Sequence, residues 1–277
     1  MTIWINKTKG EYRMIHALAA VIAFMTFSLD FGQVIIEDLL PLNTPPQKVI
    51  ALTFDDGPNP STTPTVLAEL EKRKITATFF LIGIHARDYP DIVKRMDKDG
   101  FEIENHTWEH LFLPHCSNAT IDVQLNRTTD LIEKITSKKP HYVHPPMWGF
   151  DKRTMAESKK CGIDTTLWTI DPSDWQDGNT NHVVTYVLSR ASAGDIVLLH
   201  DIHPTTVAAV PIILDSLSKK GFKFVTVSEL LKIDQKLATE GKLDWRKKAE
   251  WQFPGLIPSA QQAEKSETAR KPNTKKE

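Results

Sequence analysis

Short apolar runs alternate with amphipathic stretches from residue 49 onward. The apolar runs predict buried strands at 49–54, 77–82, 101–103, 142–143, 165–169, 196–199 and 223–225. The stretches between them predict helices at 64–73, 90–98, 121–136, 152–160, 183–191 and 206–220. Strands that alternate with helices along a chain usually form one parallel sheet. We therefore expect an α/β fold, a distorted and incomplete (β/α)7-type barrel with parallel strands.

The N-terminal part of the chain has a different pattern. Residues 1–13 carry Lys7, Lys9 and Arg13, and residues 14–29 form an apolar run of 16 residues. A basic segment followed by an apolar run is typical of a signal sequence or an uncleaved signal anchor. The run is short for a membrane span of about 20 residues and long for the apolar part of a signal peptide. We expect an exported protein that is periplasmic, on the cell surface or anchored in the membrane.

The remaining boundaries follow from changes in composition. Residues 30–48 contain Pro41, Pro45 and Pro46 and are expected to be a linker. The strand and helix pattern then defines the main domain at 49–233, followed by a C-terminal extension at 234–257. Residues 258–277 have no aromatic side chain and many Lys, Glu, Ser and Gln residues, so they are expected to be disordered.

The length, hydrophobic content and net charge of the chain limit the functions that it can have. The chain has 277 residues, 40% of them hydrophobic, and a formal net charge of −1. A chain of this length can bury a full core, and the absence of a basic excess argues against a nucleic-acid partner. The two cysteines, Cys116 and Cys161, are too few for a disulfide framework, and whether they pair stays open. We expect a monomer.

Adjacent carboxylates mark the end of the first predicted strand. Asp55 and Asp56 follow an apolar run and precede Gly57 and Pro58. The carboxyl end of a strand is where α/β barrels place their chemistry. Mutual repulsion disfavours two identical roles for neighbouring carboxylates, so we expect one to bind a metal and the other to act as a base. Alone, the same four residues would also suit a plain surface turn.

Two histidines follow another apolar run. His106 and His110 are four residues apart, which on one helical turn would bring both rings to the same side. An isolated pair of this kind could equally be solvated, but with Asp56 it offers two nitrogens and one oxygen. Such a donor set suits zinc, and also cobalt or nickel.

A third histidine ends the predicted strand at 196–199. His200 could donate a proton to a leaving group near neutral pH, and it could also be a structural histidine that closes a strand. Upstream, Asp174 is a candidate partner that orients and charges His200, with Trp175 beside it as an apolar wall. The segment around Asp174 also suits an ordinary turn.

These motifs, in this order, resemble the NodB-type polysaccharide deacetylases, also called carbohydrate esterase family 4. The similarity covers about residues 49–231, and its motifs lie at 53–58, 106–110, 171–175 and 198–201. The resemblance implies that Asp55 is the general base that activates water. It implies that Asp56, His106 and His110 hold a divalent metal, usually zinc or cobalt.

The resemblance also implies the roles of the remaining residues. His200 would protonate the departing amine, Asp174 would tune His200, and Trp175 and Leu198 would line the pocket for the acetyl methyl group. The third motif of the family is expected at 144–149. There Pro146, Met147 and Trp148 are the expected substrate contacts, with the backbone N–H of Met147 available to an oxyanion.

One position departs from the family pattern. His144 stands where the family usually has an arginine that pairs with the catalytic base. Histidine is shorter and titratable, and it cannot make a bidentate fork to a carboxylate. We expect an active enzyme in which His144 tunes the base. An altered pH optimum, weak activity or a glycan-binding homologue without turnover are the alternatives.

The function implied is metal-dependent removal of N-acetyl groups from a polysaccharide that contains N-acetylglucosamine, with release of acetate. Peptidoglycan, chitin-type oligomers and poly-N-acetylglucosamine all stay open as the polymer. An O-acetyl esterase that acts on acetylated xylan is the alternative within the same site chemistry.

Overall fold

The computed structural model describes residues 48–176 and 178–239. The segments expected at 1–13 and 14–29, nearly all of the linker at 30–48, and residues 240–277 lie outside the described residues. The expected end of the main domain at residue 233 lies within the last described helix, α9, Val227–Thr239.

Seven parallel strands form one sheet in the described part of the chain. Its order is β5-β4-β3-β2-β1-β6, and β7 also pairs with β1. β2 pairs with residues 53–55 of β1, whereas β7 pairs with residues 49–51 on the other half of β1. The strands are β1 Val49–Asp55, β2 Thr78–Leu81, β3 Glu102–Asn105, β4 Tyr142–Val143, β5 Asp164–Thr165, β6 Asp195–His200 and β7 Lys223–Val225.

The sheet is open between β5 and β6 in the described residues. A continuous strand at 165–169 was expected, but β5 ends at Thr165. The chain then crosses from the β4 side of the sheet to β6, where Ile170 forms a single bridge with Val197. The N–H groups of Thr169 and Ile170 both donate to the carbonyl of Ile196, at 2.8 and 3.1 Å. The expectation of one strand here was wrong because the segment changes pairing partner. The expectation of an incomplete parallel barrel is confirmed.

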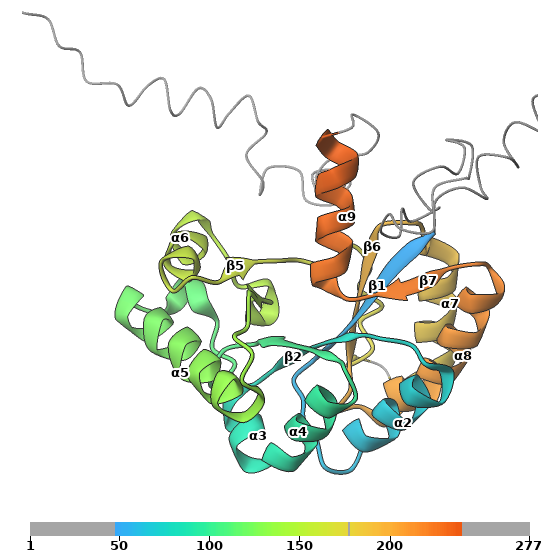
Figure 1. The fold of residues 1–277 in the computed structure, drawn as a ribbon, viewed down its shortest axis with the longest axis horizontal. Coiled ribbons are helices and arrows are strands. Elements are labelled where there is room, and N and C mark those ends of the chain that lie inside the picture. Colours follow the sequence, from blue (N-terminus) through green and yellow to red (C-terminus); the bar gives the residue numbers. More distant parts are fainter. Residues whose placement is uncertain (1–47, 177, 240–277) are drawn as a thin grey trace, which may run out of the picture. The chain divides into compact units, whose positions relative to one another are not determined.

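Helices α2 to α8 surround the outer side of the curved sheet, whereas α9 lies on its other side next to β1 and β7 (Figure 1). The helices expected from the sequence are present, with ends shifted by no more than a few residues. Helices α3 and α9 and two 3-10 turns were not expected. The other bounds are α2 Thr63–Arg73, α3 Gly83–Asp88, α4 Pro90–Lys98, α5 Asn118–Thr136, α6 Lys152–Lys160, α7 Thr180–Arg190, α8 Pro204–Lys219, η2 Leu113–His115 and η3 Pro146–Trp148.

Two apolar layers follow from the alternation of side chains along the strands. In β1, Ile50, Leu52 and Phe54 pack between the sheet and the outer helices. Val49 and Ala51 face the inner layer, which also contains side chains of β2, β6 and α9. Counting on by twos from Val49 places Asp55 on the inner side, at the carboxyl end of the strand. None of the helices in the described ranges is long and apolar enough to cross a membrane.

Candidate active site and metal centre

Asp55 lies at the end of β1 and is held by His144, which follows β4. The side chain of Asp55 is almost completely buried, and His144 is fully buried. Because a carboxylate only accepts, Nδ1–H of His144 donates to both oxygens of Asp55, at 3.0 and 3.1 Å. The imidazole stacks on Phe80, with ring centroids 3.5 Å apart. His144 therefore gives Asp55 a shared hydrogen bond in place of an arginine fork.

Burial lowers the pKa of His144 below its ordinary value, although the Asp55 carboxylate acts in the opposite direction. The residue is thus a neutral donor toward Asp55, with its proton on Nδ1. Within the described residues, the buried Nε2 atom of His144 has no hydrogen-bond partner.

Asp56 and the two histidines of the second motif bring three donor atoms together. One oxygen of Asp56, Oδ1, lies 3.3 Å from Nε2 of His106 and 3.3 Å from Nε2 of His110. The donor atoms of these residues all lie within 4.8 Å of one another. These are the three ligands predicted from the sequence.

The arrangement fits a divalent metal. Oδ1 of Asp56 is buried and makes no hydrogen bond within the described residues. Nδ1 of His106 donates to the backbone carbonyl of His144 at 2.8 Å, so Nε2, which faces Asp56, is the nitrogen that would bind a metal. Burial opposes the ionised form of Asp56, but contact with His106 and the charges of His106, His200 and His110 hold its pKa well below the usual range. Two imidazoles and one carboxylate are a donor set that suits zinc, cobalt or nickel.

The histidines do not lie on a helical turn, so that expectation was wrong. Residues 106–110 form a loop, in which Thr107 and His110 have φ values of 65° and 56°. Side chains outside the loop accept hydrogen bonds from three of its N–H groups. The Asn105 side chain accepts from the N–H of Thr107 at 2.7 Å, and Gln124 of α5 accepts from the next two N–H groups, at 3.0 and 2.8 Å. The two rings still converge, with centroids 4.9 Å apart.

His200 is adjacent to Asp55 across the β1 and β6 pair. Its Nδ1–H donates to Asp174 at 2.7 Å, and its backbone N–H donates to the other oxygen of Asp174 at 2.8 Å. Thr206 of α8 also donates to Asp174. Burial lowers the pKa of His200, but the hydrogen bond and charge of Asp174, with the charges of Asp55 and Asp56, outweigh this and raise it to about 9. The expected pairing of His200 with Asp174 is present.

The expected substrate contacts have very different exposures. Leu198 and Pro146 are buried, and Leu198 belongs to the inner apolar layer. Met147 is 54% exposed and Trp175 is 55% exposed. Met147 and Trp148 have positive φ values of 53° and 57°, so the backbone turns sharply there. Trp148 packs on Trp168, with ring centroids 4.1 Å apart. The ring of Trp175 is therefore open to solvent.

Two residues that support the site were not found from the sequence. His85 of α3 contacts the backbone carbonyl of Asp56 through Nδ1, at 2.7 Å. Asp201 is fully buried and accepts from the hydroxyl of Thr63 at 2.5 Å, next to Gly57. Burial, together with the charges of Asp56 and Asp55, raises the pKa of Asp201 to about 7. His85 lies in a short segment before α4 that contains no recognisable motif, so the sequence did not indicate a role for it. Asp201 is the last residue of the motif at 198–201, and no role was expected for it.

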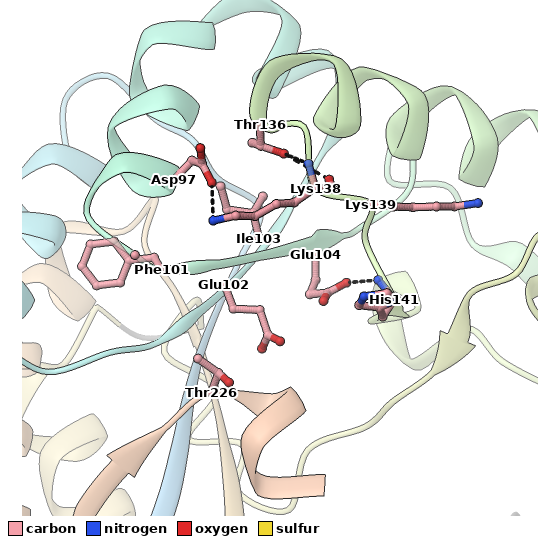
Figure 2. Close-up of a pocket in the computed structure, with 11 residues that line it drawn as sticks. Asp97, Phe101, Glu102, Ile103, Glu104, Thr136, Lys138, Lys139, His141 and Thr226 are labelled. Carbon is pink, nitrogen blue, oxygen red and sulfur yellow. Dashed lines mark hydrogen bonds and ion pairs between the residues drawn. The ribbon is translucent and has the colours of Figure 1, made fainter. Parts of the chain in front are cut away.

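A separate pocket of about 420 Å³ lies beside β3 and the residues directly before it. Figure 2 shows Glu102 and Glu104 directed toward the same space, with Thr226 nearby. Glu104 accepts from the backbone N–H groups of His141 and Tyr142, at 2.7 and 2.8 Å. Burial and the charge of Glu102 raise the pKa of Glu104 to about 9. None of the candidate active-site residues lines this pocket.

Comparison with known proteins identifies the family to which this fold and site belong. Residues 42–166 match the polysaccharide deacetylase family. The peptidoglycan-N-acetylmuramic acid deacetylase PdaC of Bacillus subtilis is 43% identical over 186 residues, which are 67% of this chain and 39% of PdaC. The peptidoglycan-N-acetylglucosamine deacetylase of Bacillus cereus is 41% identical over 191 residues, 67% of this chain and 89% of the relative. The chain belongs to the polysaccharide deacetylase family.

Solved structures support the same assignment. PdaC has a TM-score of 0.67 at 38% identity, over 76% of this chain and 99% of that chain. A pseudoenzyme of carbohydrate esterase family 4 from Bacillus anthracis has a TM-score of 0.64 at 27% identity, over 68% of this chain and 66% of that chain. The expected family, fold and enzyme class are therefore confirmed.

Proposed function

We propose that this chain is an exported, divalent-metal-dependent deacetylase that removes N-acetyl groups from the glycan strands of peptidoglycan, with zinc as its metal. The convergence of Asp56, His106 and His110 beside two buried Asp and His pairs carries this proposal. The names of the two relatives with 43% and 41% identity support peptidoglycan as the polymer. The apolar run at 14–29 behind a basic segment supports export.

Asp55 is the proposed general base. Its carboxylate accepts the proton of the attacking water, and the hydrogen bond from His144 keeps it in one orientation. A divalent metal held by Asp56, His106 and His110 would polarise the amide carbonyl and make water a stronger nucleophile. The backbone N–H of Met147 is the proposed donor to the oxygen that becomes negative during attack.

His200 is the proposed general acid. Because Nδ1 of His200 is bound to Asp174, its proton for the reaction is on Nε2. Transfer of that proton to the amide nitrogen lets the C–N bond break, and the products are acetate and a free amine on the sugar. Asp174 keeps His200 protonated at neutral pH. The exposed side chains of Met147 and Trp175 are the proposed apolar contacts for sugar rings and the acetyl methyl group.

The decisive experiment is acetate release by the full chain from N-acetylglucosamine oligomers and from purified peptidoglycan. It is run with added zinc or cobalt, after chelation, and with Asp55→Asn. We expect release that disappears after chelation and returns with metal. We expect Asp55→Asn to bind metal as the unaltered protein does and to lose at least about 100-fold in rate, the usual contribution of a general base. Mass spectrometry of digested peptidoglycan then identifies which amino sugar lost its acetyl group.

His144 favours one competing function, a glycan-binding homologue without turnover. A folded protein that binds oligomers but releases no acetate with any metal would support that function, and His144→Arg would then be tested for recovery of activity. Release of acetate from acetylated xylan, with none from N-acetylated glycans, would instead support an O-acetyl esterase.

A further inference from the structure

Helix α3 lies between the two loops that carry the proposed metal ligands. The backbone N–H of Ile82, directly before α3, donates to the carbonyl of Gly57 at 3.2 Å. The N–H groups of Gly83 and Ile84 donate to the carbonyls of Thr107 and Trp108, at 2.9 and 3.1 Å. One short segment thus binds the loop that follows β1 and the loop that follows β3.

The side chain of His85 adds a contact to Asp56 itself. Nδ1 of His85 lies 2.7 Å from the backbone carbonyl oxygen of Asp56. A carbonyl oxygen only accepts, so the proton of this bond is on Nδ1 of His85. The imidazole is half-buried, and it comes from an element that provides none of the proposed metal ligands.

We propose that His85 is a positioning residue that fixes the direction of the Asp56 carboxylate for metal binding, which rests on the proposed metal-dependent function. Asp56 has a φ of 71°, a left-handed conformation that is uncommon outside glycine. Aspartate tolerates it better than most residues, and support from the surroundings helps to keep it. The bond from His85 supplies such support at the peptide group of Asp56. With that peptide group fixed, Oδ1 of Asp56 stays 3.3 Å from both histidine Nε2 atoms. Residues that orient metal ligands typically contribute about 10-fold to 100-fold in metal affinity.

Three variants separate this role from a general structural one. His85→Leu removes the donor. His85→Asn keeps an N–H donor on the atom bonded to Cγ, which is the position of Nδ1 in histidine, whereas His85→Gln moves the donor one bond farther out. His182 of α7 is exposed and lies on a helix that provides no proposed ligand, so His182→Leu is the matched control.

The measurements are zinc affinity of the full chain, by competition with a chromogenic chelator, and the visible spectrum of the cobalt-loaded protein. We expect His85→Leu to weaken zinc binding by about 10-fold to 100-fold and to change the cobalt spectrum. We expect His85→Asn to bind zinc within about threefold of the unaltered protein, because one neutral hydrogen bond is kept. His85→Gln should lie nearer to the leucine variant, and His182→Leu should match the unaltered protein.

Equal zinc affinity of His85→Leu and the unaltered protein would overturn the inference, and so would an asparagine variant as weak as the leucine variant. If His85→Leu does not fold, the comparison of asparagine with glutamine decides, and equal weakening in both contradicts the role. Failure of the unaltered protein to bind zinc or cobalt would overturn the proposed function, and this inference with it.

Discussion

His200 forms an ion pair with the buried Asp174, and the protonation state of His200 matters for the proposed proton transfer. The pKa of His200 is raised from 6.5 to about 9, because the bond to Asp174 outweighs the effect of burial. A general acid works in its protonated form, so activity that depends on His200 is present below pH 9 and lost as the pH rises through about 9.

Asp174→Asn should move this alkaline limit to lower pH. Burial lowers the pKa of His200, and the Asp174 carboxylate is the main group that opposes this effect. Without that carboxylate, the pKa of His200 falls toward or below 6.5. We expect the variant to lose activity between pH 7 and 8, where the unaltered protein is still active. The pH profile of kcat/KM for acetate release measures the shift. An unchanged alkaline limit would show that another group controls it.

For His144, the sequence predicted the partner but not the geometry of the contact. The sequence identified it as the substitute for an arginine and indicated Asp55 as its partner. The sequence did not predict that a shorter side chain could reach both oxygens of Asp55. That depends on the stacking of the imidazole on Phe80 of β2, which places Nδ1 within 3.1 Å of the carboxylate.

At the scale of elements, the start of α3 is tightly packed against the loop that carries the two histidines. A Cβ atom at Gly83 would lie 2.3 Å from the ring of Trp108 and 2.5 Å from the hydroxyl of Thr128. Both neighbours are buried, so neither can move without disturbing its surroundings. The absence of a side chain at Gly83 is therefore a requirement of this packing.

Gly83→Ala should destabilise the protein and weaken metal binding together. We expect a loss of about 1 to 3 kcal/mol in the free energy of unfolding, the usual cost of overpacking. Asp88→Ala in the same helix removes an exposed ion pair with Arg87 and should leave the free energy of unfolding nearly unchanged. Urea unfolding and zinc titration test both variants. Wild-type stability in Gly83→Ala would contradict the close packing.

Helices with a long amphipathic pattern were predicted correctly from the sequence. Segments whose conformation depends on contacts with distant residues were not. Helices α4 and α6 have the expected ends because their amphipathic pattern is local. Helix α3 has only six residues, too few for a period to show. Residues 106–110 form a loop because side chains of Asn105 and Gln124 take N–H groups that a helix would use differently.

At the scale of the whole molecule, Glu104 is a buried carboxyl group in the sheet, two residues before the proposed metal ligand His106. Its pKa is 4.5 as an ordinary glutamate and about 9 in the folded protein, because burial and Glu102 oppose its charge. Between these two pH values the folded state holds a proton that the unfolded state has lost. The contribution of Glu104 to stability therefore falls as the pH rises.

Glu104→Gln should remove this dependence, since the amide oxygen can still accept from the N–H groups of His141 and Tyr142. We expect the variant to become more stable than the unaltered protein as the pH rises from 5 to 8, by at most about 1.4 kcal/mol per pH unit. Chemical unfolding at several pH values gives the slope. Parallel stability curves for the two proteins would show that Glu104 ionises normally.

The sequence by itself determined the fold class and the positions of most candidate site residues. Asp55 and His200 end apolar runs, and His106 follows shortly after one. In a parallel sheet the carboxyl ends of all strands lie at the same edge, so residues far apart in the chain are brought together by topology alone. This is why the candidate metal ligands and both proposed proton-transfer residues could be selected before any coordinates were known.

Only the tertiary structure decided how these residues are held. The contacts of His144 with Asp55 and of Asp201 with Thr63 join residues 89 and 138 positions apart. The hydrogen bond from His85 is accepted by the backbone carbonyl of Asp56. Because every residue has a backbone carbonyl, no sequence pattern could identify this acceptor. Local periodicity reports which side of an element is buried. It carries no information on which side chain of another element completes a hydrogen bond, because that depends on the packed positions of both.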